Sequence, residues 1–169
     1  KIKIIGDKSL SKRDFSRVTI PLEKFGVKFS YKIKNKLPLT ILGTQSAEGI
    51  QYLENKGSAQ CKSSIMLAAL NASGTTSIKA KKSRDHTELL FKYLKIPIKV
   101  RKTKKFDFID IKKPKKINAF NYQIPGDISS SAFFMVLTTL ADNSKLLIKS
   151  PKKIKIIGDK SLSKRDFSR

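Results

Sequence analysis

The sequence is poor in acidic residues and cysteine, and it has no long apolar run. It carries 13 Asp and Glu against 37 Lys and Arg, with one cysteine and no tryptophan. The lone Cys61 excludes an intrachain disulfide and agrees with a reducing, cytoplasmic location. The longest apolar segment, residues 132–137, is far shorter than the ~20 residues that span a bilayer, so no membrane partner is expected. No secretory or transit peptide is expected either.

The length and the apolar content indicate a folded chain. A chain of 169 residues can form one core or two small, closely packed subdomains. Hydrophobic residues make up 39% of it, which is ordinary for a globular protein and excludes wholesale disorder.

The net charge of +24 admits two interpretations. Such a surplus is typical of proteins that neutralise nucleic-acid phosphates, but it also follows from a general bias towards lysine. Of the 37 cations, 31 are lysine and 6 are arginine, the residue preferred for base and bidentate phosphate contacts. The lysines alternate with apolar residues, as on the wet face of strands, and no aromatics are interleaved with them as a stacking platform. We expect no specific nucleic-acid partner, but a field that attracts small anionic substrates.

One segment occurs twice without change. Residues 1–17, KIKIIGDKSLSKRDFSR, recur at 153–169. Structural repeats diverge because each copy packs against different neighbours, so this identity indicates a cloning scar, a wrapped or permuted end, or a very recent duplication. The second copy is left out of the fold prediction, although it could replace the first.

Between the copies, strand and helix patterns alternate. Strands are predicted at residues 1–5, 27–33, 37–43, 50–53, 75–81, 96–102, 106–112, 120–124 and 144–149. Helices are predicted at residues 14–25, with a kink at Pro21, and at 58–70, 85–94 and 129–141.

Two of these helices are apolar on nearly all sides. They contain SIMLAAL at residues 64–70 and AFFMVL at 132–137, so both should be buried on most sides, while the strands alternate with lysine. This predicts helices inside and sheets outside, the reverse of a doubly wound fold. We expect two subdomains, 1–83 and 84–152, each mixing strands and helices around a buried helix layer.

Four predicted helix beginnings share hydroxyl and carboxylate residues. They are SLSKRD (9–14), GSAQCKSS (57–64), SRDHTE (83–88) and PGDISSS (125–131). Each can cap free backbone N–H groups, and Asp85 with Glu88 fits a variant of the capping box. For any one of these segments, capping alone is the preferred interpretation.

Three of the four add cations or an amide that a cap does not need. These residues are Lys12, Arg13, Gln60, Lys62 and Arg84. A helix N-terminus binds anions through its N–H groups and dipole, and a nearby guanidinium adds bidentate contacts. Several such ends facing one cavity would bind a multiply anionic small molecule.

In combination, these motifs resemble the EPSP synthase family, the enolpyruvyl transferases of the shikimate pathway. The matching segments are GDKSLSKRDFSRVTIPLEKFGV, GSAQCKSSIMLAALNASGTT, SRDHTELL and IPGDISSSAFF, in the family's order over about residues 4–150. The resemblance implies an α/β fold of the inverse α/β architecture, built from βαβαββ subdomains with buried parallel helices and outer mixed sheets.

The resemblance also implies a reaction, the transfer of the enolpyruvyl group of phosphoenolpyruvate to the 5-hydroxyl of shikimate 3-phosphate. Carried over by position, Ser58, Ala59, Gln60 and Arg84 would bind shikimate 3-phosphate, and Arg13 and Gln60 would bind phosphoenolpyruvate. No metal or organic cofactor is implied. These are electrostatic and positioning roles.

Other residues of these motifs receive local roles. His86 is predicted to make a local hydrogen bond, because it has no partner at metal or triad spacing. Ser83 could cap the helix or donate to a substrate oxygen. Asp14 stands where the family has proline and either weakens the attraction of Arg13 for anions or caps the next helix. Cys61 is predicted to be a buried hydrophobe.

The family's remaining motifs, including its proton-transfer groups, have no counterpart in this sequence. We therefore expect no catalytic residue in this chain, little or no activity from it alone, and a second domain as a potential partner. Two alternatives stay open: a fragment related to the transferase that acts on UDP-N-acetylglucosamine, and a non-catalytic basic module that binds anions.

Overall fold

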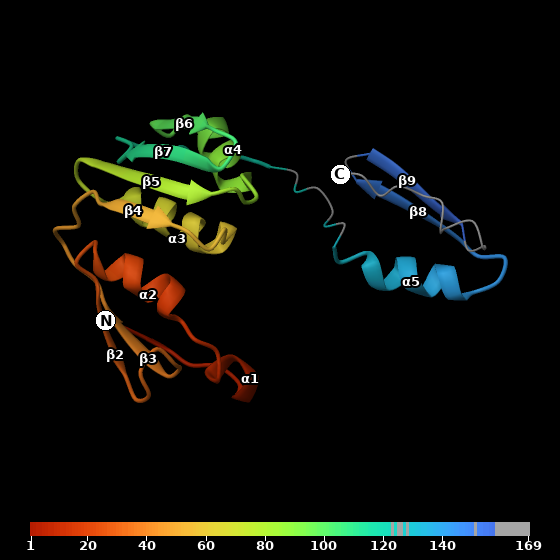
Figure 1. Ribbon diagram of the computed structural model, residues 1–169, viewed down its shortest axis with the longest axis horizontal. Coiled ribbons are helices and arrows are strands. Elements are labelled where there is room, and N and C mark those ends of the chain that lie inside the picture. Colours follow the sequence, from red (N-terminus) through yellow and green to blue (C-terminus); the bar gives the residue numbers. More distant parts are fainter. Residues whose placement is uncertain (123, 125–126, 128, 151, 158–169) are drawn as a thin grey trace. The chain divides into compact units, whose positions relative to one another are not determined.

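The computed structural model describes residues 1–122, 124, 127, 129–150 and 152–157. The chain forms two compact units, Lys1–Asn118 and Ala119–Arg169 (Figure 1). Among the described residues, no helix combines the length and the apolar character needed to cross a lipid bilayer.

Unit 1 begins with a small antiparallel sheet. Its strands are β1 (Ile2–Ile4), β3 (Leu39–Leu42) and β2 (Lys28–Tyr31), in the order β1-β3-β2. Two helices, α1 (Lys8–Ser11) and α2 (Ser16–Glu23), connect β1 to β2. The strands β1 and β2, in which lysine alternates with apolar residues, lie at the two edges of this sheet. The central strand β3 contributes the buried Leu39.

A four-stranded mixed sheet forms the rest of unit 1. Strand β4 (Gln51–Glu54) pairs in parallel with β5 (Thr75–Lys81), and β7 (Phe106–Lys112) lies antiparallel between β5 and β6 (Ile98–Lys102). Helix α3 (Ala59–Ala69) joins β4 to β5, and α4 (His86–Tyr93) joins β5 to β6. The order from β4 to β7 is therefore βαβαββ.

The two helices of this motif run parallel on one face of the sheet. Strands β5 and β6 are both antiparallel to β7, so α3 and α4 return along the sheet in the same direction. Ile65 and Met66 of α3 and Phe91 of α4 form one buried cluster with inward residues such as Ile78 and Ile109. Helix α3 contacts α2 as well as strands β5 and β7 (Figure 1). The predicted inverse α/β architecture is confirmed.

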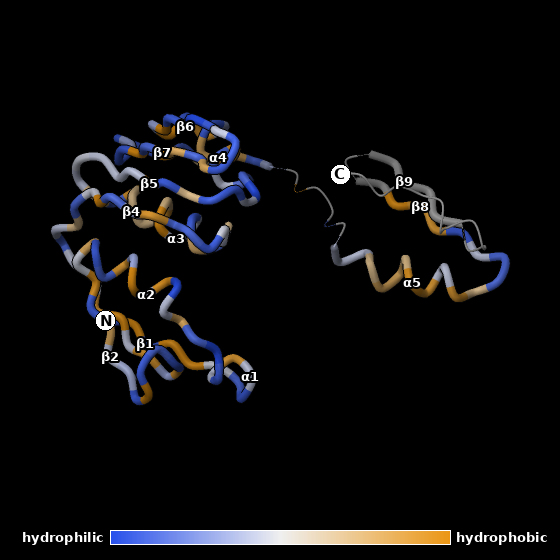
Figure 2. The backbone as a smooth tube through the Cα atoms, viewed as in Figure 1, coloured by the Kyte–Doolittle hydropathy of each residue, from blue (hydrophilic) through white to orange (hydrophobic). Residues whose placement is uncertain are grey.

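Unit 2 contains α5 (Ala132–Leu140) and an antiparallel hairpin of β8 (Lys145–Ser150) and β9 (Lys152–Ile157). Helix α5 is strongly apolar (Figure 2), yet Phe133 is 82% exposed and Leu140 is 78% exposed. The prediction that this helix is buried on most sides is wrong for this structure. One hairpin within the unit covers only one side of a helix.

Two further predictions differ from the structure. The strand predicted at residues 120–124 is absent from its described residues, 120–122 and 124. Instead of a strand ladder, the rings of Phe120 and Tyr122 meet edge to face, with centroids 6.4 Å apart. The second copy of the repeat, excluded from the prediction, supplies β9, while its residues 158–169 lie outside the described residues.

The division into subdomains 1–83 and 84–152 stays a prediction. In the structure, strands from both sides of residue 83 join the same four-stranded sheet, and the boundary of the two compact units falls between Asn118 and Ala119.

Candidate functional site

The start of α3 is held by two local caps. Ser58 is the N-cap, and its Oγ accepts a hydrogen bond of 3.2 Å from the Cys61 amide. The preceding loop is closed by Glu54, whose buried carboxylate accepts from the amides of Lys56 and Gly57 at 3.0 and 2.8 Å. These bonds fix the entry into the helix, as predicted for Ser58. Because Ser58 Oγ acts as an acceptor here, its own hydroxyl proton can be donated to a ligand.

The start of α4 differs from the predicted capping box. Asp85 is the N-cap residue but makes no side-chain cap hydrogen bond; instead its Oδ2 accepts from Lys102 Nζ at 2.6 Å. The hydrogen bond from Lys102 is the main cause that lowers the pKa of Asp85. Glu88 turns away from the cap and forms an ion pair with Lys62, so the capping-box prediction is wrong.

Lys62 joins the two helix starts. Its side chain has no exposed area, and its Nζ donates to the Arg84 carbonyl at 3.0 Å and lies 2.5 Å from Glu88 Oε1. The prediction that Lys62 adds a cation for an anionic ligand is therefore wrong. The chain pattern contained a signal: residues 62, 65, 66 and 69 form one buried helical stripe, so Lys62 occupies a core position.

A second contact links the same two helices. The hydroxyls of Ser63, which follows Lys62, and Thr87, the second residue of α4, lie 2.6 Å apart. The structure thus brings Ser58, Ala59 and Gln60 to the same end of the helix pair as Arg84. Ser58 and Ala59 are half-buried, and the side chains of Gln60 and Arg84 are exposed, so both can meet a ligand.

Arg13 lies in the link between two helices rather than in a helix start. The helix predicted at residues 14–25 corresponds to α2, and α1 is an additional short helix with Asp7 as its N-cap, accepting from the Leu10 amide at 2.7 Å. Arg13 follows the end of α1 and is exposed. Asp14 Oδ1 accepts from the Ser16 amide at 2.6 Å, but the N-cap of α2 is Phe15 and has no side-chain cap bond, so Asp14 orders the turn before the helix and does not cap it. Its hydrogen bonds with Ser16 lower the pKa of Asp14.

The link that carries Arg13 reaches α3 through α2. Cys61 Sγ donates to the Arg17 carbonyl at 3.0 Å, and Cys61 is buried as predicted. Burial is the main cause that raises the pKa of its thiol. A cavity of about 60 Å³ lies between α2 and the β4–α3 loop, and Ser16 and Ser58 are among its lining residues. Ser16 and Arg17, which follow Arg13 in the chain, thus lie next to the start of α3.

The remaining candidates have local surroundings. Ser83 Oγ is buried and has no hydrogen-bond partner among the described residues, so it does not cap α4. His86, the first residue of α4, is exposed. Within the described part of the chain, no group of three or more His, Cys, Asp or Glu could hold a metal ion.

The fourth predicted helix start is described only in part, because Pro125, Gly126 and Ile128 lie outside the described residues. Asp127 accepts from the Ser129 amide at 2.9 Å and from the Ser130 hydroxyl at 2.8 Å. These bonds lower the pKa of Asp127. Residues 129–131 form a turn ahead of α5.

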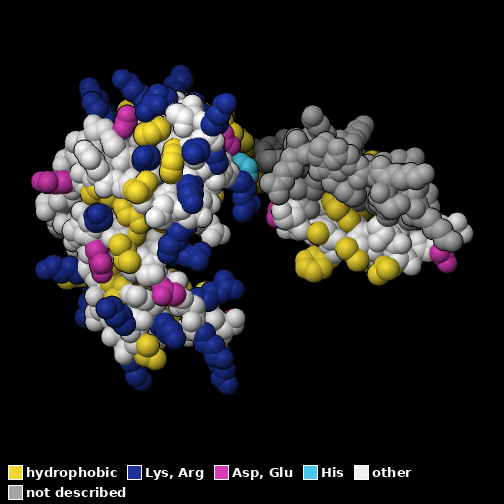
Figure 3. Space-filling model, viewed as in Figure 1, with side chains coloured by type: hydrophobic (Ala, Val, Ile, Leu, Met, Phe, Trp, Pro, Cys, Tyr) yellow, Lys and Arg dark blue, Asp and Glu magenta, His cyan; other side chains and the backbone are white. Residues whose placement is uncertain are grey.

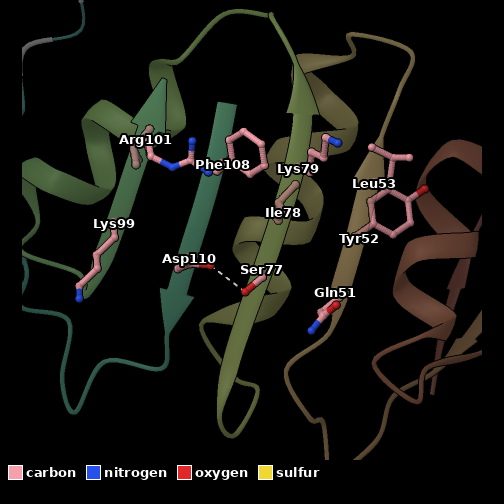
Figure 4. Close-up of a pocket in the computed structure, with 11 residues that line it drawn as sticks. Gln51, Tyr52, Leu53, Ser77, Ile78, Lys79, Lys99, Arg101, Phe108 and Asp110 are labelled. Atoms are coloured by element: carbon pink, nitrogen blue, oxygen red, sulfur yellow. Dashed lines mark hydrogen bonds between the residues drawn. The ribbon is translucent and has the colours of Figure 1, made fainter. Parts of the chain in front are cut away.

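A larger groove of about 660 Å³ lies on the outer face of the four-stranded sheet, opposite α3 and α4 (Figure 4). Four of its polar side chains already contact neighbours. The Arg101 guanidinium stacks 4.0 Å above the Phe108 ring, Lys79 Nζ lies 5.8 Å from the same ring, and Ser77 donates to Asp110 at 2.7 Å. The groove carries the cations Lys79, Lys99 and Arg101 beside Asp110, but it offers an anion none of the free backbone amides that a helix N-terminus provides.

Basic side chains are spread over the visible face of unit 1 (Figure 3). They do not gather around one element, as in a solvated lysine-rich surface. The distribution of cations on this face therefore does not single out one anion site.

Comparisons with known proteins agree on one family. The family described as EPSP synthase (3-phosphoshikimate 1-carboxyvinyltransferase) matches residues 1–165. The chain is similar to the 3-phosphoshikimate 1-carboxyvinyltransferases of Thermotoga sp. (strain RQ2), at 41% identity over 86% of this chain and 33% of the relative, and of Bacillus subtilis (strain 168), at 37% identity over 87% and 34%. An EPSP synthase structure from Acinetobacter baumannii matches with a TM-score of 0.68 and 35% identity, over 88% of this chain and 33% of that one. The chain thus spans about a third of the length of these relatives.

Proposed function

Because this chain belongs to the EPSP synthase family, we propose that its α3 and α4 starts form the shikimate 3-phosphate half of an enolpyruvyl transferase site. The observation that carries the proposal is the Lys62 bridge, which holds the segment of Arg84 against the helix that starts with Ser58 and Gln60. Two adjacent helix N-termini then direct free amides and partial positive charge towards the same ligand.

Each predicted residue has a role in this proposal. Arg84 makes charge-assisted hydrogen bonds to the phosphorylated ligand, Ser58 donates its hydroxyl proton, and Ala59 leaves room for close approach. Gln60 contacts both substrates, and Arg13 binds the phosphate or carboxylate of phosphoenolpyruvate. The groups position the 5-hydroxyl and stabilise developing charge, whereas proton transfer belongs to residues outside this third of the family's length.

The proposal includes the setting of the reaction. The enzyme would work in the cytoplasm without a metal or organic cofactor, and the partner of this chain would be the second domain of the family. The 169-residue chain alone should bind shikimate 3-phosphate weakly and release little or no phosphate from the two substrates.

A calorimetric titration of shikimate 3-phosphate into the full chain tests the proposal, with melting temperature as a second readout. Arg84→Ala should weaken binding at least about tenfold, since a hydrogen bond to a charged group contributes ~1.5–3 kcal/mol. Arg101→Ala is the matched control, because Arg101 is also an exposed arginine but lies in the groove on the opposite sheet face. Equal losses in both variants, or no binding by the parent chain, would contradict the proposal.

Two other candidates give different results in the same assay. A fragment related to the UDP-N-acetylglucosamine transferase would be stabilised by that nucleotide sugar and not by shikimate 3-phosphate. A basic anion-binding module using the outer groove would bind duplex DNA at physiological salt and lose that binding with Arg101→Ala. We expect neither response.

A further inference from the structure

The buried Lys62–Glu88 pair is the most unusual interaction near the proposed site. Lys62 is fully buried and Glu88 is 3% exposed, and the two charges lie 2.5 Å apart. Neither carboxylate oxygen of Glu88 has a hydrogen-bond partner among the described residues, so the ion pair with Lys62 is the interaction that compensates this carboxylate. Lysine and glutamate are almost never buried so completely unless they are paired.

Stability alone does not account for the pair. Residue 62 occupies a core stripe with Ile65, Met66 and Ala69, where an apolar side chain would fit the pattern. Replacing a buried ion pair with apolar residues of similar volume is often neutral or stabilising, because burial removes both charges from water. The presence of this ion pair is therefore not explained by its contribution to core stability.

The explanation lies in the third member of the interaction, the Arg84 carbonyl. Lys62 Nζ donates to this oxygen at 3.0 Å, so the ammonium binds the backbone of the residue proposed to hold the ligand. Glu88, in the first turn of α4, pairs with the ammonium and orients it towards α4. The Ser63–Thr87 contact of 2.6 Å holds the same two turns together at a neighbouring point.

Resting on the proposed function above, we propose that Lys62 and Glu88 are positioning residues for substrate binding. They fix the Arg84 backbone against the first turn of α3. This restricts the positions that the Arg84 guanidinium can take relative to Ser58 and Gln60 before the ligand binds. A segment that is already ordered loses less conformational freedom when the ligand binds. The pair thus sets the affinity for shikimate 3-phosphate without touching it.

The test compares paired substitutions in the full chain. Lys62→Met with Glu88→Leu removes both charges and keeps the volume, and the melting temperature should stay within a few degrees of the parent. Affinity for shikimate 3-phosphate should fall about tenfold, because Arg84 is no longer held. Amide hydrogen exchange should rise at residues 84–87 and remain unchanged in β5 and β7.

A conservative pair separates positioning from packing. Lys62→Gln with Glu88→Gln restores a polar donor near the Arg84 carbonyl without charge, and it should recover most of the lost affinity. The matched stability control is Ile109→Val, a fully buried residue of β7, which should lower the melting temperature and leave affinity unchanged.

The outcomes distinguish this inference from the proposed function. If the parent chain binds and Arg84→Ala abolishes binding, but the Met/Leu pair binds like the parent, the positioning role is refuted while the site stands. Loss of the cooperative melting transition in both double variants would also refute it, because the pair would then serve the stability of the fold. Absence of binding by the parent chain would refute the proposed function itself.

Discussion

Gly49, which precedes β4, lies directly against the backbone of β5. A Cβ placed on Gly49 would lie 2.3 Å from the carbonyl oxygen of Thr75 and 2.5 Å from its carbonyl carbon. These are backbone atoms of β5, so no side chain can rotate away. Ordinary carbon–oxygen contacts are about 3.3–3.6 Å, and Gly49→Ala would have to push the two segments apart by about 1 Å.

The displacement would act on two backbone hydrogen bonds. The Gly49 amide donates to the Ser73 carbonyl at 2.7 Å, and the Ser77 amide donates to the Ile50 carbonyl at 2.8 Å. Weakening one or both, at ~0.5–1.5 kcal/mol each, adds to an overpacking cost of ~1–3 kcal/mol. We expect Gly49→Ala to lower the free energy of unfolding by ~2–5 kcal/mol in total.

Chemical denaturation followed by circular dichroism measures this loss, and the melting temperature should fall by roughly 8–20 °C for a domain of this size. Gly43→Ala is the control, because a Cβ at that position would meet no atom within 4 Å beyond its own chain neighbours. It should change the free energy of unfolding by less than ~0.5 kcal/mol. If Gly49→Ala and Gly43→Ala melt alike, the steric argument fails.

Further predictions concern the core and the pH dependence of stability. Ile65→Ala should cost ~2–5 kcal/mol in a denaturant titration, because Ile65 is fully buried in α3; Leu67→Ala, 55% exposed on the same helix, should cost far less, and equal losses would contradict the assigned burial. The folded-state pKa of Asp14 lies below its ordinary value of 3.8, so its stabilising effect is present above that pH and is lost as pH falls through the lowered pKa. Asp14→Asn should therefore show a smaller decrease of melting temperature between pH 5 and pH 2 than the parent, and identical acid profiles would refute a stabilising hydrogen bond between the Ser16 amide and Asp14.

The strands of the large sheet could be predicted because their sequences alternate. Residues 75–81 and 106–112 become β5 and β7 with the predicted bounds, and α3 differs from its prediction by one residue at each end. The position of β7 between β5 and β6 could not be predicted, since strand order depends on which edges meet after collapse. The strand prediction at 120–124 was wrong for the same reason, because an alternating sequence does not show whether a neighbouring strand is present to pair with it.

The sequence predicted local contacts of the candidate site but not the contacts between residues far apart in the chain. Ser58 caps its helix as predicted, because that bond is local. The Lys62–Glu88 pair joins residues 26 positions apart, and no local rule relates them. Each residue does lie on the buried stripe of its own helix, so a charged residue at a core position was the available signal.

The pentapeptide KIKII has a consequence for how this protein meets its own copies. The same letters form the outer strand β1 beside β3 and, in the second copy, strand β9 beside β8. In the first copy, β1 is an edge strand whose exposed Lys1 and Lys3 disfavour pairing with the edge of another copy. Neutralising those cations, by acetylation for example, would remove the charge repulsion and favour edge-to-edge strand pairing between copies of the chain.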